Sequence, residues 1–213
     1  MKLYWSRRAT SAVSDYEVMR SICAELPNEE AFLPDYDVLT ECCLDASKPL
    51  RILDFGAGML RNSSGLLQLS NKWHVTAYDS SSMLDRGLRK FGDTLDISRL
   101  DFNTEWQELK ATRFDAVIAI LVFQHIEAAP LREILCSLTT MTKQLCVFGR
   151  RSLDDFAQQT WTPVWPIIME FWQPIKVFNK NVAHPTESLL SRTRKSLHQG
   201  EPHDHCGAVF VPR

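Results

Sequence analysis

The sequence predicts an α/β fold, a doubly wound and mostly parallel sheet covered by helices, and three observations indicate it. From Leu50 to Phe148, short apolar runs alternate with amphipathic stretches of helical length, as in repeated βαβ units. The first run leads directly into a glycine pair, Gly56 and Gly58, where such a sheet places its first turn. The 213 residues, 45% hydrophobic and 23% charged, suffice for one globular domain with a full core.

Five strands and three helices are expected within this region. The strands are short apolar runs, at residues 51–55, 74–78, 98–101, 116–121 and 144–148. Ser63 is the expected N-cap of a helix that runs to about Leu69, and Ser82 that of a helix over 83–90. Pro130 is expected in the first turn of a third helix, because its missing N–H has no helical acceptor there.

We expect a single domain of three parts. A helical cover at 1–45 precedes a cofactor-binding core at 50–149, and a substrate cap with C-terminal strands follows at 150–213. Apolar periodicity around residues 18–26 and 36–44 predicts two helices in the cover.

The C-terminal part begins with an irregular aromatic segment at 160–174, followed by a helix at about 186–198 and a strand at 207–211. Its aromatic side chains either close over a flat or apolar substrate or form part of the core. They are Trp161, Trp165, Phe171 and Trp172.

The glycine pair predicts a nucleotide-like ligand at the end of the first strand. Without a Cβ, Gly56 and Gly58 let the backbone turn sharply and let a ligand approach the amides of the following helix. About 20 residues on, Asp79 ends the next strand, where a carboxylate can accept hydrogen bonds from both hydroxyls of a ribose. The third glycine of the dinucleotide fingerprint would fall at Arg61, which argues against a nicotinamide coenzyme.

Two segments of this region resemble class I S-adenosylmethionine-dependent methyltransferases. Motif I of that family is similar to Ile52-Leu-Asp54-Phe-Gly56-Ala-Gly58, and its acidic strand end is similar to Tyr78-Asp79-Ser-Ser-Ser-Met83-Leu84. The continuation Leu60-Arg61-Asn62-Ser63 is similar to small methyltransferases of the tellurite-resistance type. The resemblance covers about half of the chain and implies a Rossmann-like, seven-stranded sheet with S-adenosylmethionine as cofactor.

The resemblance also implies roles for the matched residues. Gly56 and Gly58 would lie along the methionine part of the cofactor and Asp79 would bind its ribose. Asp54 would support the loop and the amino group of the cofactor.

Three further residues match positions near the adenine. Met83 would touch the adenine ring, and Asp101 with Phe102 would meet its amino group. Alternatively, Asp101 is a turn residue after a strand with no contact to the cofactor.

The end of the fourth strand, Leu121-Val-Phe123-Gln124-His125, should face the same crevice. It lacks the Asn/Asp-Pro-Pro-aromatic sequence of nucleic-acid amino methyltransferases, so methylation of an exocyclic base amine is not expected. Methyl transfer requires an aligned nucleophile and, for a weakly acidic one, removal of a proton. His125 is the candidate base, since an imidazole pKa of about 6.5 suits proton transfer at neutral pH. Its alternative role is packing beside the cofactor.

Two other polar groups are candidates for ligands. Arg150 and Arg151 follow the fifth strand and could hold an anionic part of the substrate, or could be a solvated pair. His203-Asp204-His205-Cys206 contains metal-ligand residue types, but no second cluster at the right spacing accompanies them, so no metal site is expected.

Charge, hydropathy and cysteine usage narrow the class of protein. The net charge of -2 and the lack of a basic run argue against a nucleic-acid partner. The longest apolar stretch, residues 116–123, is too short to span a membrane. Six cysteines without CxxC spacing fit a reducing compartment, so the cytoplasm is the expected location.

The function expected from the sequence is methyl transfer from S-adenosylmethionine to a small-molecule acceptor. Three alternatives stay open: an RNA or protein methyltransferase, an inactive cofactor-binding partner subunit, and, weakened by Arg61, a nicotinamide enzyme.

Overall fold

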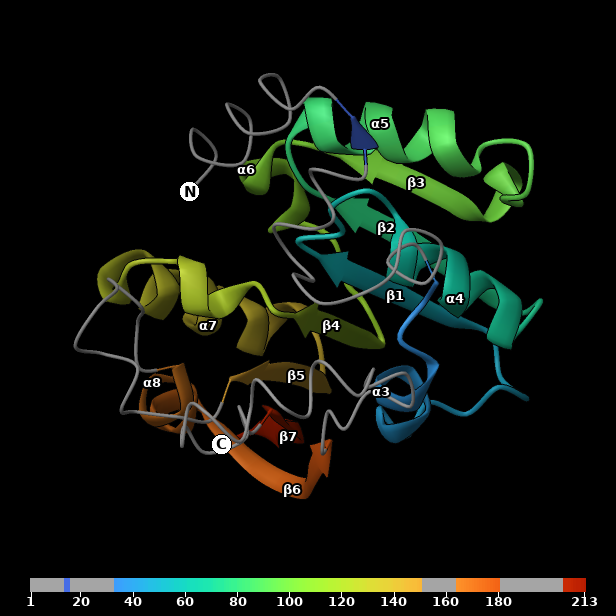
Figure 1. Cartoon of the computed structure of the whole chain (residues 1–213). Coiled ribbons are helices and arrows are strands. Elements are labelled where there is room, and N and C mark those ends of the chain that lie inside the picture. The colour runs from blue at the N-terminus through green and yellow to red at the C-terminus, as the bar shows by residue number, and fades with distance from the viewer. Residues whose placement is uncertain (1–13, 16–32, 151–163, 181–204) are drawn as a thin grey trace, which may run out of the picture.

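The computed structural model describes residues 14–15, 33–150, 164–180 and 205–213. Figure 1 shows one sheet with helices on both sides of it. The predicted helices around 18–26 and 186–198 lie outside the described residues.

The sheet has seven strands in the order β3-β2-β1-β4-β5-β7-β6. The first five strands in sequence are parallel to one another, whereas β7 runs antiparallel to both β5 and β6. The sheet is therefore mixed. The strands are β1 (Leu50–Phe55), β2 (Trp73–Tyr78), β3 (Leu100–Asn103), β4 (Ala116–Ile120), β5 (Leu145–Arg150), β6 (Trp172–Lys180) and β7 (His205–Pro212).

The winding of the chain reverses between β1 and β4. From β1 the chain proceeds outward through β2 to β3, and it then returns to place β4 and β5 on the other side of β1. Ligands of such sheets bind at this switch point, beyond the carboxyl ends of the strands. The residues that follow β1 and β4 are therefore the first place to look for a site.

Helices form a layer on each face of the sheet (Figure 1). On one face, α3 (Tyr36–Glu41), α4 (Arg61–Leu69) and α5 (Ser81–Phe91) pack on β-strand side chains such as Ile52 and Ile118. On the other face, α6 (Trp106–Leu109), α7 (Ala128–Met141) and α8 (Val164–Phe171) pack on side chains such as Leu53 and Val117. Alternate residues of one strand thus serve two separate cores. No helix in the described part is long and apolar enough to cross a membrane.

Two expected N-caps are wrong, and one helix start is confirmed. The first helix begins at Arg61 rather than after Ser63, and the next begins at Ser81 with Ser80 as its N-cap. Ser63 lies inside α4, where its hydroxyl donates a hydrogen bond to the buried carboxyl group of Asp54. Pro130 is the third residue of α7 and so lies in its first turn as predicted.

The third strand lies two residues later than the sequence predicted. Residues Ile97–Arg99 form a short 3-10 turn, and the side chain of Asp96 accepts a hydrogen bond from the Ser98 amide at its start. The strand then runs over Leu100–Asn103, so Asp101 is an inner residue of β3 and not its end.

The aromatic segment, which was predicted to be irregular, contains helix α8 and the start of strand β6. Trp172 is fully buried, and its indole N–H donates to the Leu135 carbonyl of α7 at 3.3 Å. Of the two roles left open for Trp172, the structure supports the core. Pro174 lies on the edge strand β6 at a register shift, where a missing N–H costs no ladder hydrogen bond.

Helix α3 confirms the second predicted helix of the N-terminal cover, in a shorter form. Cys42 directly follows it and forms a disulfide with Cys146 of β5, 104 residues away. The expectation of unpaired cysteines is therefore wrong for this pair. Cys43 and Cys136 are free and exposed.

Candidate functional site

The loop after β1 has the sharp turn that its glycines predicted. Gly56 and Gly58 have φ angles of 76° and 55°, in the left-handed region that favours glycine. The amides of Gly56 and Ala57 both donate to the Tyr78 carbonyl, at 2.8 and 3.1 Å. These two hydrogen bonds join the loop to the end of β2.

Gly56 also lets the end of β4 approach the loop. A Cβ on Gly56 would lie 2.4 Å from Val122 Cγ2, far inside van der Waals contact. The loops after β1 and β4 therefore meet side by side at the switch point. Position 122 was not singled out from the sequence, because this contact joins residues that lie far apart along the chain.

Asp79 lies at the end of β2 and faces the glycine loop. Its Oδ2 accepts a hydrogen bond from the Gly58 amide at 2.9 Å, and its Oδ1 accepts one from the Ser80 amide at 2.6 Å. The side chain is half-buried, and desolvation raises its pKa above the ordinary value despite these two hydrogen bonds. The carboxylate is thus fixed beside the loop, with further lone pairs that can accept from a ligand.

Asp54 is a buried carboxyl group under the same loop. The Ser63 hydroxyl of α4 donates to its Oδ2 at 2.6 Å. Burial raises its pKa to about 6, the Ser63 hydrogen bond opposes this rise, and the nearby charge of Asp79 adds to it.

Replacing Asp54 by asparagine is expected to stabilise the protein at neutral pH. The native carboxyl binds its proton more tightly than the unfolded one, so the free energy of unfolding falls as pH rises from about 4 to about 6. A shift of about 2 pK units corresponds to at most about 3 kcal/mol, which Asp54→Asn should recover at pH 7.5. Urea unfolding of both proteins at pH 4, 5, 6 and 7.5 measures this. A wild type that gains stability relative to the variant as pH rises would contradict it.

Leu60, which ends this loop, and Arg61, which begins α4, were not predicted as site residues from the sequence. Leu60 is fully buried and has a φ of 64°, an unusual conformation for a residue with a branched side chain. It precedes α4, and no side chain of the described residues caps the first amides of that helix, which are the groups that a helix start can offer to a ligand. The charge of Arg61 lowers the pKa of Asp54, which places a cation near the loop. The positive φ of Leu60 could not be predicted from the sequence, because leucine seldom adopts this conformation.

The three residues assigned to the adenine are placed differently. Met83 of α5 is buried, and its Cε lies 3.6 Å from where a Cβ of Gly58 would stand, so it borders the loop. Phe102 is partly exposed on β3. Asp101 instead pairs with His74 Nε2 at 2.8 Å, and His74 lies near the amino end of β2, away from the crevice. This placement weighs against the adenine role of Asp101.

The end of β4 is the segment where the sequence predicted contacts with the acceptor. Leu121, directly after the strand, has a φ of 58°, and Phe123–His125 form a 3-10 turn. Gln124 is buried and His125 is half-buried, with Gln124 Nε2 3.4 Å from His125 Nε2. Left-handed residues after both β1 and β4 place backbone strain at the switch point, where functional sites often hold it.

The predicted substrate residues are only partly placed. Arg151 and Trp161 lie outside the described residues, and for Arg150 only its backbone, at the carboxyl end of β5, is described. The ring of Trp165 stacks on Phe210, with centroids 6.3 Å apart. Phe210 pairs with Leu145, the first residue of β5, so Trp165 lies toward the amino end of β5 and away from the carboxyl ends of the parallel strands. This placement weighs against contact with a substrate there.

A metal centre is absent from the described ranges: no group of three or more His, Cys, Asp and Glu side chains that could hold an ion occurs in them. In the predicted tail cluster, His203 and Asp204 lie outside those ranges, and His205 with Cys206 begin β7.

Comparisons with known proteins give matches at the level of structure alone, since no protein-family model and no curated protein matches the sequence. N-methyltransferase NodS from Bradyrhizobium japonicum WM9, in complex with S-adenosylhomocysteine, matches with a TM-score of 0.66 and 11% identity over 99% of this chain and 97% of that one. Geranyl diphosphate C-methyltransferase from Streptomyces coelicolor A3(2) matches with a TM-score of 0.63 and 9% identity, over 97% and 88%. A putative RNA methyltransferase from Pyrococcus horikoshii matches with a TM-score of 0.57 and 14% identity, over 88% and 86%. The chain therefore has the class I methyltransferase fold.

Proposed function

We propose that this protein is an S-adenosylmethionine-dependent methyltransferase that acts on a small-molecule acceptor. The main support for the proposal is the hydrogen bond from the Gly58 amide to the Asp79 carboxylate, at the point where the sheet reverses its winding. A nucleoside needs a carboxylate for its ribose and a Cβ-free loop beside it, and both are present at one place. Matches to structures that hold S-adenosylhomocysteine support the same cofactor.

The charges around the loop fit the groups of that cofactor. Its amino acid part carries an ammonium and a carboxylate, and the loop offers the Asp54 carboxyl and the Arg61 guanidinium. The uncapped amides at the start of α4 add partial positive charge for the carboxylate. Asp79 would hold the ribose hydroxyls, and the apolar Met83 would border the adenine.

The bound cofactor supplies an electrophilic methyl group, and the protein has to align an acceptor with it. The turn Phe123–His125 follows β4 beside the loop, so an acceptor in the crevice would contact it. We assign His125 to remove a proton from the acceptor when the acceptor is weakly acidic, and Gln124, 3.4 Å away, to hold its ring. Arg150, at the carboxyl end of β5, would attract an anionic acceptor.

Two other functions share the same cofactor site. The fold match to a putative RNA methyltransferase favours a macromolecular acceptor, whereas the net charge of -2 disfavours a polyanionic one. An inactive partner subunit would bind the cofactor and transfer no methyl group.

Calorimetric titration tests the proposal with S-adenosylmethionine, S-adenosylhomocysteine and, as a control ligand, a reduced nicotinamide coenzyme. We expect micromolar binding of both methyl-donor forms and none of the nicotinamide, because Arg61 replaces the third glycine. A folded protein that binds neither S-adenosyl compound would overturn the proposal. Release of S-adenosylhomocysteine in a screen of small-molecule and RNA acceptors then separates an enzyme from an inactive subunit.

A further inference from the structure

Helix α3 lies between α4 and the strands β5 and β6. The segment directly before α4, residues 56–60 after β1, is called the cofactor loop below. At the start of α3, the Asp35 amide donates to Asn62 Oδ1 in the first turn of α4, at 3.1 Å. Pro34 and Leu39 pack so closely on α4 that a Cβ at Gly65 would lie 2.5 and 2.8 Å from their side chains. The start of α3 therefore supports the helix turn that directly follows the loop.

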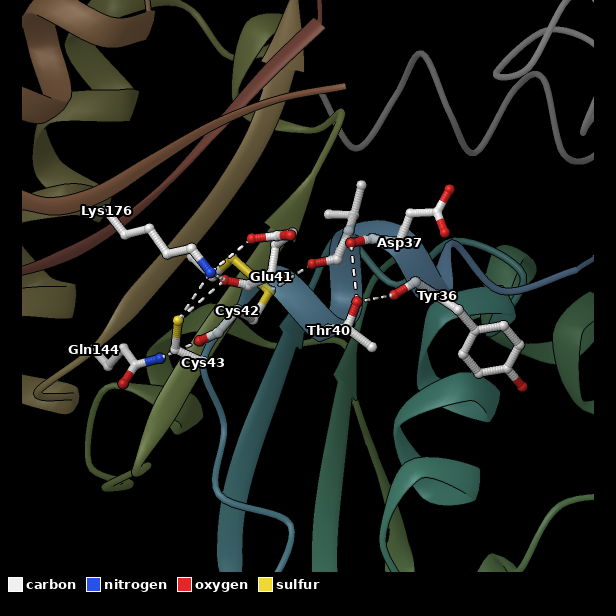
Figure 2. Close-up of polar contacts among 10 residues, drawn as sticks. Tyr36, Asp37, Thr40, Glu41, Cys42, Cys43, Gln144 and Lys176 are labelled. Carbon is white, nitrogen blue, oxygen red and sulfur yellow. Dashed lines mark hydrogen bonds and ion pairs between the residues drawn. A yellow bond between two sulfur atoms is a disulfide. The ribbon is translucent and has the colours of Figure 1, made fainter. Parts of the chain in front are cut away.

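The other end of α3 is fixed to the sheet by Cys146 of β5, by Gln144 directly before β5 and by Lys176 of β6, and most of these contacts are drawn in Figure 2. Cys42 forms the disulfide with Cys146 of β5. Gln144 Nε2 donates to the Cys42 carbonyl at 2.6 Å. Lys176 Nζ of β6 pairs with Glu41 Oε2 at 2.6 Å and also donates to Cys43 Sγ at 3.3 Å.

The disulfide is a covalent bond, whereas the other contacts are hydrogen bonds and an ion pair. Lys176 and Glu41 are each about 40% exposed, so water and salt compete with their pairing. Cys42 and Cys146 are 0% and 1% exposed, within the core that also contains Leu39 and Leu66 of the two helices. The disulfide is thus the strongest contact between the end of α3 and the sheet, and reduction of its two sulfurs removes it.

We propose that the Cys42–Cys146 disulfide is a redox-sensitive clasp that holds α3 against the sheet and thereby orders the cofactor loop. Its opening is a two-electron exchange with a dithiol reductant. The reductant's two thiols become a disulfide, the Cys42–Cys146 bond breaks, and each protein sulfur ends with one proton. With the clasp open, the start of α3 supports Asn62 and Gly65 less firmly, and the loop after β1 becomes more mobile.

The effect on ligand affinity rests on the proposed function, so the experiment has one readout that depends on it and one that does not. The independent readout is hydrogen exchange of residues 56–65, measured on protein oxidised by diamide and on protein reduced by dithiothreitol, with thiol titration to count the two sulfurs released. The dependent readout is the Kd for S-adenosylhomocysteine in both states. We expect exchange in this segment to rise about tenfold on reduction and the Kd to rise about fivefold.

Variants separate the clasp from the exposed thiols. Cys146→Ala and Cys42→Ala should behave as reduced protein under both conditions, whereas Cys43→Ser and Cys136→Ser should still respond as wild type. Equal hydrogen exchange of residues 56–65 in oxidised and reduced wild type would overturn the clasp. So would failure of diamide to remove two thiols. If neither state binds S-adenosylhomocysteine, the proposed function fails, and the exchange data alone decide about the clasp.

Discussion

Replacing Gly56 by alanine is expected to lower the free energy of unfolding by about 3 kcal/mol and to abolish measurable cofactor binding. The left-handed backbone costs an L-residue about 1–2 kcal/mol. The new Cβ would also lie 2.4 Å from Val122 Cγ2, and such overpacking costs about 1–3 kcal/mol. Urea unfolding and calorimetric titration measure the two effects.

A second variant separates the two costs. Gly56→Ala combined with Val122→Ala removes the γ-carbons that the new Cβ would meet, so part of the stability should return while the backbone strain remains. Gly149→Ala is a matched control, because its φ is not left-handed. Its new Cβ would meet a single atom within 4 Å, Gln124 Oε1 at 3.3 Å, and this side-chain atom can shift. A Gly56→Ala protein with the urea midpoint of the wild type would show that the loop has another conformation.

Asp79→Asn is expected to weaken the binding of S-adenosylhomocysteine by about 100-fold. Each hydrogen bond from a ribose hydroxyl to a charged acceptor contributes about 1.5 kcal/mol or more, so two contribute about 3 kcal/mol. Unfolding is not expected to explain the loss. The pKa of Asp79 is raised, so its ionised form costs stability at neutral pH. Asparagine removes that cost, which offsets the one hydrogen bond that its NH2 group cannot accept from the Gly58 or the Ser80 amide.

Asp85→Asn is the control for this experiment, because Asp85 is an exposed acid of α5, the helix that follows Asp79. It should bind as the wild type does. Binding by Asp79→Asn within about threefold of the wild type would mean that the carboxylate does not hold the ribose, and the site would have to be assigned elsewhere.

The sequence was sufficient to predict the centre of the fold because its signals are local. The strand, the two glycines and the acid at the end of the next strand follow one another within 30 positions, and each has a direct backbone consequence. The matches to known structures confirm the fold that this pattern indicates. The roles of the residues at the site stay proposals that the experiments above test.

The errors came from contacts between distant segments. Ser63 was predicted as an N-cap, but its hydroxyl donates to the buried carboxyl of Asp54 instead, because a buried carboxyl without a hydrogen-bond partner costs more than an uncapped helix end. Trp172 and Pro174 read as an irregular cap, but the partner that makes their segment a strand is more than 30 residues away. Cys42 and Cys146 lie 104 residues apart, and only the tertiary structure brings them together.

The place of β7 between β5 and β6 determines the order in which the sheet can be assembled during synthesis. The first five strands can pair as they leave the ribosome, each beside one already made. Residues 172–180 emerge without a neighbour, since both β5 and β6 pair with residues 205–212, which are translated later. Until then the outer edge of β5 is open to other nascent chains, which is a hazard of non-local strand pairing. The sheet is therefore complete only after β7 has been made and pairs with both β5 and β6.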